Sequence, residues 1–214
     1  MKGDIIIVED HHRRAASAIA EHLSPRIRRG ERPFIITVAG ESGSGKSETG
    51  QALADALSAL DLAPFVFQQD DYFDLPPRSN DRQRRQDISR VGVSEVRLDL
   101  LDEHLAAARR RDQSIAKPLV DYEADTIGEE RVDLSATDVV VAEGTYTTLL
   151  TNVDYRIFIA RNRLETLAAR ERRAREPIEP FIERVLEIEH RIIAPHRERA
   201  DAVITDEYKV LFVG

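Results

Sequence analysis

Cysteine is absent from this chain of 214 residues, which excludes disulfide bonds, thiolate zinc sites and a cysteine nucleophile. Long hydrophobic runs are missing as well, since no apolar stretch approaches the roughly 20 residues that a membrane-spanning helix needs. The first residues, 1–4, lead into the acidic pair Glu9 and Asp10 and lack the profile of a signal peptide. These absences predict a cytoplasmic protein without a membrane partner.

Positive charge is also in short supply, and arginine carries almost all of it. The only lysines are Lys2, Lys46, Lys117 and Lys209, and 31 lysines and arginines face 39 acidic residues, so the formal net charge is -8. This balance argues against a general nucleic-acid binder and against attraction to an anionic membrane surface. The length suits a single domain, residues 1–214, with room for a small lid.

One glycine-rich segment, Gly40–Ser47, reads Gly-Glu-Ser-Gly-Ser-Gly-Lys-Ser and matches the phosphate-binding P-loop pattern at every fixed position. The apolar run Phe34–Ala39 before it is typical of a strand, and Glu48–Leu60 after it has the apolar spacing of a helix. Strand, glycine loop and helix in this order distinguish a P-loop from a chance glycine-rich turn. The segment therefore predicts a binding site for a nucleoside triphosphate.

Each residue type in this loop has a physical role. Glycines let backbone N–H groups curl around an anion, and the following helix adds unpaired N–H groups and the positive end of its dipole. We expect the Lys46 ammonium to reach the β- and γ-phosphates and the Ser47 hydroxyl to bind Mg²⁺. The predicted ligand is ATP with Mg²⁺, and the predicted binding residues are Gly40, Ser42, Gly43, Ser44, Gly45, Lys46 and Ser47.

Strand-like and helix-like segments alternate along the rest of the chain. This order predicts an α/β fold of the P-loop NTPase type, a three-layer arrangement with a mostly parallel sheet and a small arginine-rich lid. Further helices are expected over Leu98–Ala108, Leu164–Arg175 and 179 to about 194. The further expected strands are Phe65–Gln68, Asp138–Ala142, Arg156–Ile159, Ala202–Ile204 and Val210–Val213.

Residues 1–32 precede the nucleotide core as an N-terminal extension. We predict a short strand at Ile5–Val8 and, after it, a helix that Pro25 and Gly30 bring to an end. The first strand could pair with the last strand of the chain or cap an edge of the sheet.

Two more segments are expected outside the sheet. Residues 74–92 are polar and rich in arginine, which predicts a mobile polar loop, and residues 161 to about 180 are predicted to be the lid region. Within the lid, Arg170 and Arg173 lie one helical turn apart. Their guanidinium groups could neutralise the negative charge that phosphoryl transfer spreads over the γ-phosphate oxygens. The alternative is a solvated helix in which these arginines pair with nearby glutamates.

Two acidic residues stand where predicted strands end. Asp70 follows the strand Phe65–Gln68 and Glu143 follows the strand Asp138–Ala142, so both belong to the rim where open α/β sheets bind their ligands. A carboxylate at Asp70 could take the proton from an attacking hydroxyl, and Glu143 is the better candidate for a magnesium ligand. Asp71 could share either role, although adjacent residues on a strand point opposite ways.

Several short segments share an order and spacing that cover most of the chain, about residues 34–205. They are Gly40–Ser47, Gln69–Phe73, Lys117–Tyr122, Val139–Gly144, Arg156–Ile159 with the arginine-rich helix after it, and Ala200–Ile204. In these segments the chain resembles the uridine kinase and phosphoribulokinase-like P-loop kinases.

That resemblance implies a five-stranded parallel sheet, a small lid and MgATP-dependent phosphate transfer to a sugar hydroxyl. It gives Asp70 the place of the catalytic base, Ser47 and Glu143 the metal side, and Arg170 and Arg173 the place of the lid arginines. It also allows a homo-oligomer.

The predicted acceptor pocket departs from that family. Uridine kinases carry a Phe-Asp-His-Pro segment whose aspartate holds the ribose hydroxyls, and the corresponding stretch, Arg90–Arg97, lacks it. The predicted acceptor residues here are Tyr72, Tyr122 and Asp99. Tyr122 could stack on a base or sugar, or simply pack beneath the sheet. The arginines of 78–90 would suit an anionic acceptor such as a sugar phosphate, or they form a solvated loop.

The function that these features favour is an ATP-dependent kinase that transfers the γ-phosphate to a hydroxyl of a small molecule, nucleoside or sugar-like. The alternatives are a regulatory NTPase that hydrolyses ATP or GTP, although no guanine-reading Asn-Lys-x-Asp motif is present, and a nucleotide-binding module without turnover. His11 and His12, which follow Glu9 and Asp10, resemble a metal cluster superficially. No further ligand set at useful spacing accompanies them, so we interpret the segment as the start of a surface helix.

Overall fold

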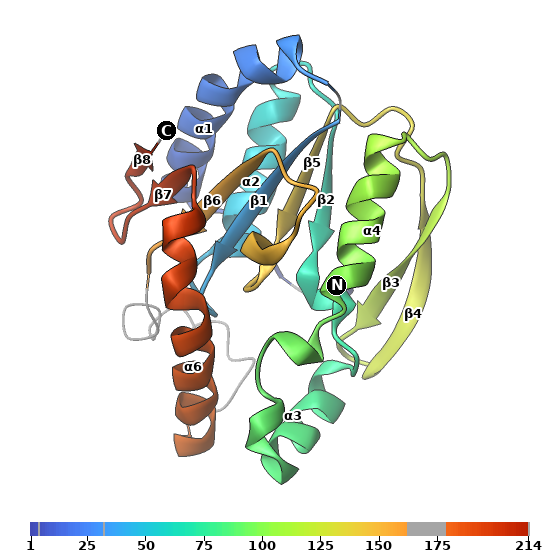
Figure 1. The fold of residues 1–214 in the computed structure, drawn as a ribbon, viewed down its shortest axis with the longest axis vertical. Coiled ribbons are helices and arrows are strands. Elements are labelled where there is room, and N and C mark those ends of the chain that lie inside the picture. Colours follow the sequence, from blue (N-terminus) through green and yellow to red (C-terminus); the bar gives the residue numbers. More distant parts are fainter. Residues whose placement is uncertain (4, 32, 162–178, 214) are drawn as a thin grey trace.

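The computed structural model describes residues 1–3, 5–31, 33–161 and 179–213. Among them, the central sheet has six strands in the order β2-β5-β1-β6-β7-β8 (Figure 1). Neighbouring strands run parallel except for β8, which pairs antiparallel with β7 at one edge. The strands are β1 (Phe34–Gly40), β2 (Pro64–Gln68), β5 (Val139–Glu143), β6 (Tyr155–Ile159), β7 (Ala202–Ile204) and β8 (Val210–Phe212).

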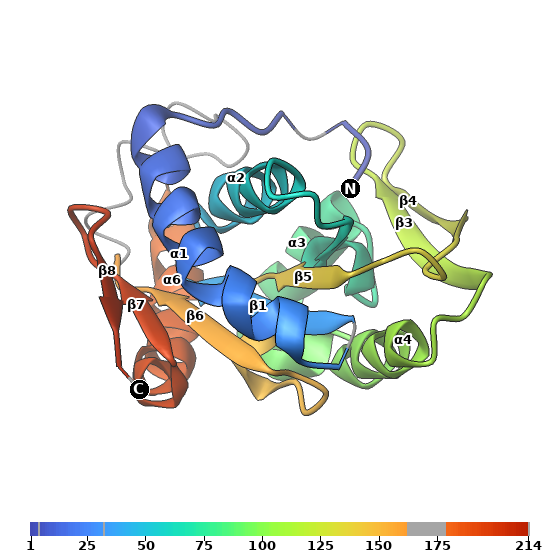
Figure 2. The ribbon, with the colours of Figure 1, turned by 90° about the horizontal axis from the view of Figure 1, so that it is seen from above.

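Helices cover both faces of this sheet, so the molecule has three layers (Figure 2). Helices α1 (Asp10–Arg29) and α2 (Lys46–Ser58) pack on one face, while α4 (Leu98–Arg109) and α6 (Pro180–Ile193) lie on the other. The predicted α/β fold with a mostly parallel sheet is confirmed. Each predicted core strand agrees with the structure to within one residue at either end.

The central strand β1 explains why the sequence pattern was so clear. All of its residues are buried, because strands flank it on both sides and helices cover both faces. Alternate side chains point to opposite faces: Ile36 and Val38 join the hydrophobic core under α1 and α2, and Ile35 and Ala39 join the core on the α4 side. The apolar run therefore supplies both cores.

The N-terminal extension differs from its prediction at the expected strand. Residues Ile5–Val8 form no strand, and Ile5 and Ile7 are exposed. Their segment does not pair with β8 either; instead Lys2 forms an isolated bridge with Asp121. A short apolar run forms a strand only when a neighbouring strand completes its hydrogen bonds, and none of the strands in the described part of the chain pairs with this run.

Helix α1 also continues past the proline that was expected to end it. Pro25 lies inside the helix, which ends at Gly30 as predicted. A proline has no N–H to donate to the carbonyl four residues earlier, here that of Glu21. The Ser24 hydroxyl donates to this carbonyl instead, at 3.3 Å, so the acceptor keeps a partner.

The prediction of a mobile polar loop over residues 74–92 is corrected by the structure. Helix α3 (Pro77–Gln86) occupies its centre, and a 3₁₀ turn at Ile88–Arg90 follows. The buried guanidinium of Arg84 donates two hydrogen bonds to Glu95, of 2.7 and 2.8 Å, and one of 3.2 Å to Glu189 on α6. Paired guanidinium hydrogen bonds fix orientation as well as position, so a charge-rich segment becomes an ordered helix.

We expect Arg84→Met to lower the free energy of unfolding by about 3–5 kcal/mol, because it leaves the carboxylates of Glu95 and Glu189 buried without their cation. Urea unfolding followed by circular dichroism measures this change. The matched control is Arg82→Met on the same helix, since the Arg82 side chain is 65% exposed and its loss should cost less than about 1 kcal/mol. Equal losses in the two variants would contradict a structural role for the buried ion pairs.

A second, antiparallel pair of strands was not predicted. Strands β3 (Ile115–Asp121) and β4 (Thr126–Val132) form a hairpin beside the main sheet. The buried carboxylate of Asp71 attaches it to the turn after β2, since it accepts hydrogen bonds of 3.0 Å from the Lys117 ammonium and from the Val120 N–H. Asp71 is therefore engaged in the scaffold, and Asp70 alone of the two faces the candidate site.

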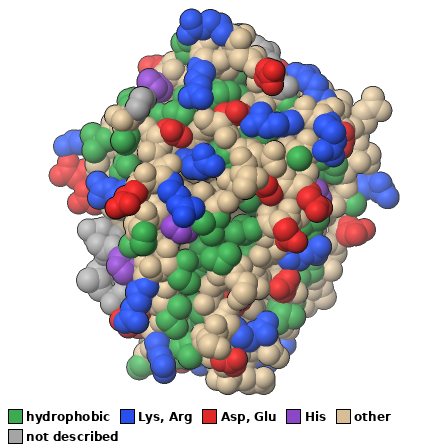
Figure 3. All heavy atoms as spheres, in the orientation of Figure 1, with side chains coloured by type: hydrophobic (Ala, Val, Ile, Leu, Met, Phe, Trp, Pro, Cys, Tyr) green, Lys and Arg blue, Asp and Glu red, His purple; other side chains and the backbone are tan. Residues whose placement is uncertain are grey.

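The surface mixes charges of both signs. On the face drawn in Figure 3, lysine and arginine side chains are interspersed with aspartate and glutamate side chains. No helix in the described ranges is long and apolar enough to cross a membrane.

Candidate active site

The glycine-rich loop joins β1 to α2 at the centre of the sheet, as its sequence predicts. Helix α2 begins at Lys46, directly after Gly45, whose φ of 95° lies in the left-handed region that favours glycine. Gly40 is required by close packing, because a Cβ there would lie 2.7 Å from the Ser44 Oγ and 3.0 Å from the Ile159 carbonyl oxygen. These glycines give the loop the curvature that an anion-binding turn needs.

The loop is also held from within. The carbonyl oxygen of Glu41 accepts hydrogen bonds from the Ser44 N–H, at 3.1 Å, and from the Lys46 ammonium, at 2.9 Å. The hydroxyls of Ser44 and Thr49 are buried and have no hydrogen-bond partner among the described residues. Unpartnered hydroxyls and a lysine at a helix N-terminus can all donate to phosphate oxygens, so these residues fit a polyphosphate.

The predicted acids meet at this loop. Glu143 is the last residue of β5, and its register partners are Val38 on β1 and Gln68 on β2. Asp70 follows Gln68 in a 3₁₀ turn and is half-buried. The structure thus brings the ends of β1, β2 and β5 to one rim of the sheet. At this rim the carboxylates of Asp70 and Glu143 are both electrostatic neighbours of Lys46.

The protonation of these acids reflects their burial. Burial raises the pKa of Glu143 to about 7, and the neighbouring Asp70 carboxylate adds to this effect, while Lys46 opposes it. Burial also raises the pKa of Asp70, against the lowering influence of Lys46. A carboxylate with a raised pKa holds a proton more readily, which is the property required of a base that takes a proton from a hydroxyl.

The two predicted magnesium ligands lie on neighbouring elements, Ser47 in the first turn of α2 and Glu143 at the end of β5. The Ser47 hydroxyl lies near enough to the Glu143 carboxyl to lower its pKa. Gly50 on α2 allows this approach, since a Cβ at that position would lie 3.3 Å from the Glu143 Cβ. Hydroxyl and carboxylate oxygens are the hard donors that Mg²⁺ prefers, so the pair fits the ion. When bound there, Mg²⁺ would neutralise phosphate charge.

The predicted acceptor residues are not brought together. Tyr72 is fully buried, its hydroxyl lies 2.8 Å from the Nδ1 atom of His104, and burial raises the pKa of its phenol. It belongs to the core and cannot touch a substrate in this arrangement. Asp99 is exposed in the first turn of α4, and Tyr122 is half-buried in the turn between β3 and β4. Arg170 and Arg173 lie outside the described residues.

Sequence reasoning missed Gln69. This side chain is buried, and its Oε1 atom accepts a hydrogen bond of 2.7 Å from the Tyr146 N–H. It packs against Gly144, where a Cβ would lie only 2.2 Å from the Gln69 Cβ. The glycine after the strand was the available signal, because it marks a close approach and not only a turn. Gln69 thereby fixes the turn that carries Asp70 against the segment after Glu143.

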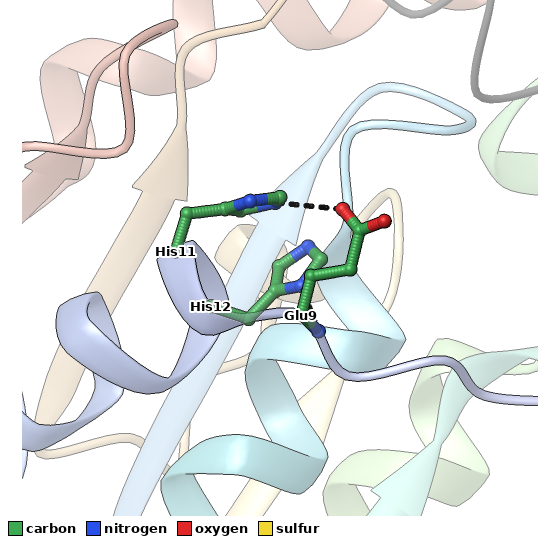
Figure 4. Close-up of side chains that lie close together, drawn as sticks. All are labelled: Glu9, His11 and His12. Carbon is green, nitrogen blue, oxygen red and sulfur yellow. Dashed lines mark hydrogen bonds and ion pairs between the residues drawn. The ribbon is translucent and has the colours of Figure 1, made fainter.

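The N-terminal histidines lie close to the back of the P-loop. Glu9, His11 and His12 have ligand atoms within 4.8 Å of one another (Figure 4). The His12 Nδ1 atom accepts a hydrogen bond from the Glu9 N–H at 3.1 Å, so its Nε2 carries the proton and lies 3.2 Å from the Tyr208 hydroxyl. With both nitrogens engaged, His12 is a poor metal ligand. The predicted helix does begin here, at Asp10. His12 itself is buried, so the prediction that this segment lies on the surface is wrong for His12.

Tyr208 connects this histidine to the phosphate loop. Its hydroxyl donates a hydrogen bond of 3.0 Å to the Ser44 carbonyl oxygen and accepts one of 2.8 Å from Arg161. A Cβ on Gly45 would lie 2.6 Å from the same hydroxyl. Helix α1 and the turn before β8 therefore support the P-loop from outside the nucleotide core.

Residues 35–207 match the family model described as Phosphoribulokinase / Uridine kinase family. The chain belongs to this family. The predicted resemblance is thereby confirmed.

The chain has low sequence identity to individual relatives in this family. The chain is 28% identical over 188 residues to the bifunctional alpha-galactosidase/sucrose kinase of Mediterraneibacter gnavus, an alignment that covers 81% of this chain and 20% of the relative. It is 31% identical over 114 residues to a uridine kinase of Ureaplasma parvum, covering 53% of this chain and 54% of the relative. The chain therefore spans about a fifth and about half of the length of these two proteins.

Solved structures show the same fold. The structure of a possible uridine kinase from Bacillus stearothermophilus aligns with a TM-score of 0.64 and 18% sequence identity, over 89% of this chain and 97% of that one. The P-loop kinase fold is thus shared, while the acceptors in the relatives' names, sucrose and uridine, differ in chemical class.

Proposed function

We propose that this protein is an ATP-dependent, magnesium-requiring kinase that transfers the γ-phosphate to a hydroxyl of an uncharged small molecule. One observation carries the proposal: Asp70, a half-buried carboxylate with a raised pKa, stands at the mouth of a complete P-loop, within electrostatic reach of Lys46 and Glu143. A P-loop binds a triphosphate, and a carboxylate beside it supplies the acceptor for the hydroxyl proton.

The proposed reaction uses these residues in order. The P-loop N–H groups and Lys46 bind the β- and γ-phosphates. Ser47 and Glu143 would hold the Mg²⁺ ion. Asp70 accepts the proton of the attacking hydroxyl while the hydroxyl oxygen forms a bond to the γ-phosphorus. The bond from that phosphorus to the bridging oxygen breaks, and ADP leaves. Arg170 and Arg173, which lie outside the described residues, are proposed to neutralise the transferring phosphoryl group.

The charge of the acceptor is argued from α3. An anionic acceptor would need free guanidinium groups, but the arginines of this helix have carboxylate partners. These ion pairs are Arg78 with Asp125, Arg82 with Asp125, Arg84 with Glu95 and Glu189, and Arg85 with Asp81 and Glu179. This pairing favours a neutral sugar-like or nucleoside acceptor over a sugar phosphate.

A regulatory NTPase is the alternative function. Such a protein needs a residue that positions water and segments that switch with the nucleotide. Asp70 fits an alcohol acceptor better, because a carboxylate base is what a hydroxyl nucleophile requires. A nucleotide-binding module without turnover is disfavoured because Lys46, Ser47, Asp70 and Glu143 are all in place.

Release of ADP from MgATP, measured in a coupled assay, tests the proposal. The panel comprises uridine, cytidine, sucrose, ribulose 5-phosphate, pantothenate and a reaction without acceptor. We expect stimulation by a neutral hydroxyl compound and little by the anionic ones. Stimulation only by ribulose 5-phosphate or pantothenate would overturn the neutral acceptor, and equal release with and without acceptor would favour the regulatory NTPase.

A further inference from the structure

Helix α6 contacts both sides of the candidate site through two consecutive residues. Glu189 reaches Arg84 on α3, at 3.2 Å, and His190 reaches Glu41 in the P-loop, where its Nδ1 atom lies 2.6 Å from the Glu41 Oε1. Helix α3 carries the arginines considered above for the acceptor, and the P-loop binds the donor. A single helix therefore contacts both α3 and the P-loop.

Glu41 is an unfavourable residue for its position. It is the second residue of Gly40–Ser47 and is only 7% exposed, so its carboxylate stands in a loop built to hold phosphate. Like charges at short range in a buried site disfavour each other. The Oε2 atom of Glu41 is buried and has no hydrogen-bond partner among the described residues, so His190 is the partner that the structure shows for this carboxylate.

The same residue also shapes the loop through its backbone. The Glu41 carbonyl oxygen receives the Lys46 ammonium and the Ser44 N–H. The side chain that contacts His190 therefore belongs to the residue whose backbone holds Lys46 and closes the turn. The His190 contact gives this side chain a partner outside the loop.

We propose that His190 is a positioning residue for the donor nucleotide. By donating to the Glu41 carboxylate it offsets the negative charge in the P-loop and keeps the loop in the shape that accepts the triphosphate. The proposal rests on the proposed function, since it assumes that the loop binds MgATP. It assigns to α6 a role in donor binding that the motif itself does not contain.

The test compares His190→Gln, Glu41→Gln and the double variant. Isothermal titration calorimetry with MgATP gives the dissociation constant, and the acceptor-stimulated assay gives KM and kcat. We expect His190→Gln to weaken MgATP binding about tenfold, a change of about 1.4 kcal/mol, and to raise KM for MgATP with kcat little changed. The double variant should bind as Glu41→Gln does, because the charge that His190 offsets is then gone.

The control is Arg191→Gln on the same helix, whose side chain is 72% exposed and pairs with Glu187; its MgATP affinity should equal that of the unaltered protein. A double variant as weak as His190→Gln would overturn the proposal and show a purely structural contact, as would unchanged affinity in His190→Gln. If the unaltered protein itself does not bind MgATP, the proposed function fails instead, so the two failures are distinguishable.

Discussion

Lys46→Ala is expected to lower kcat/KM for phosphate transfer by at least about a thousandfold, which corresponds to about 4 kcal/mol of transition-state stabilisation. The ammonium stands at the first turn of α2 and is held by the Glu41 carbonyl oxygen at 2.9 Å. A flexible lysine side chain at this position is the cation that holds phosphate oxygens in a P-loop. Steady-state ADP release at several MgATP concentrations measures the loss.

The control for this variant is Lys209→Ala, since the Lys209 side chain is 73% exposed and pairs with Glu207, two positions away. It should keep full activity. Turnover near that of the unaltered protein in Lys46→Ala would remove the basis for assigning catalysis to this loop. Lys46 also lowers the pKa of both Asp70 and Glu143, so its loss should leave these acids protonated to higher pH.

Asp70→Asn is expected to abolish phosphate transfer while leaving MgATP binding within about twofold of the unaltered protein. The amide keeps the shape of the side chain but cannot accept the hydroxyl proton, and loss of a general base costs about 10²–10⁴ in rate. Single-turnover transfer measured with the acceptor found in the panel, beside calorimetric titration of MgATP, separates chemistry from binding.

Asp74→Asn is the matched control, because Asp74 lies four positions along the same segment but is exposed. Collapse of MgATP binding in Asp70→Asn, with transfer per bound nucleotide preserved, would make Asp70 a structural residue. Loss of transfer in both variants would show that a disturbed segment, and not the missing Asp70 carboxylate, causes the loss.

Much of the site was predictable because its chemistry is local. Gly40–Ser47 is continuous in sequence, and each part of the loop has one physical requirement, so the motif predicts its own geometry. Asp70 and Glu143 were predictable for a related reason: both follow apolar strands, and parallel strands end at a common rim. The order of the strands in the sheet places the ends of β2 and β5 side by side, as the register of β5 with β1 and β2 shows.

The errors share another cause. Tyr72 sits beside Asp70 in sequence, yet the 3₁₀ turn Gln69–Tyr72 directs its ring into the core. Residues 74–92 have the composition of a solvated loop, and only the distant acids Glu95 and Glu189 make Arg84 a buried member of a helix. Propensity and charge pattern describe a segment alone, whereas these outcomes depend on partners far along the chain.

The sequence by itself therefore determined the α/β class, the place of the glycine-rich loop and the position of two acids at the rim, because strand periodicity and loop chemistry are properties of contiguous residues. Tertiary structure alone decided which charges are paired. It neutralised the arginines of α3, placed His12 and Tyr208 behind the P-loop, and brought His190 to Glu41 across 149 positions. Electrostatic partners are chosen by distance in space, and the fold sets that distance.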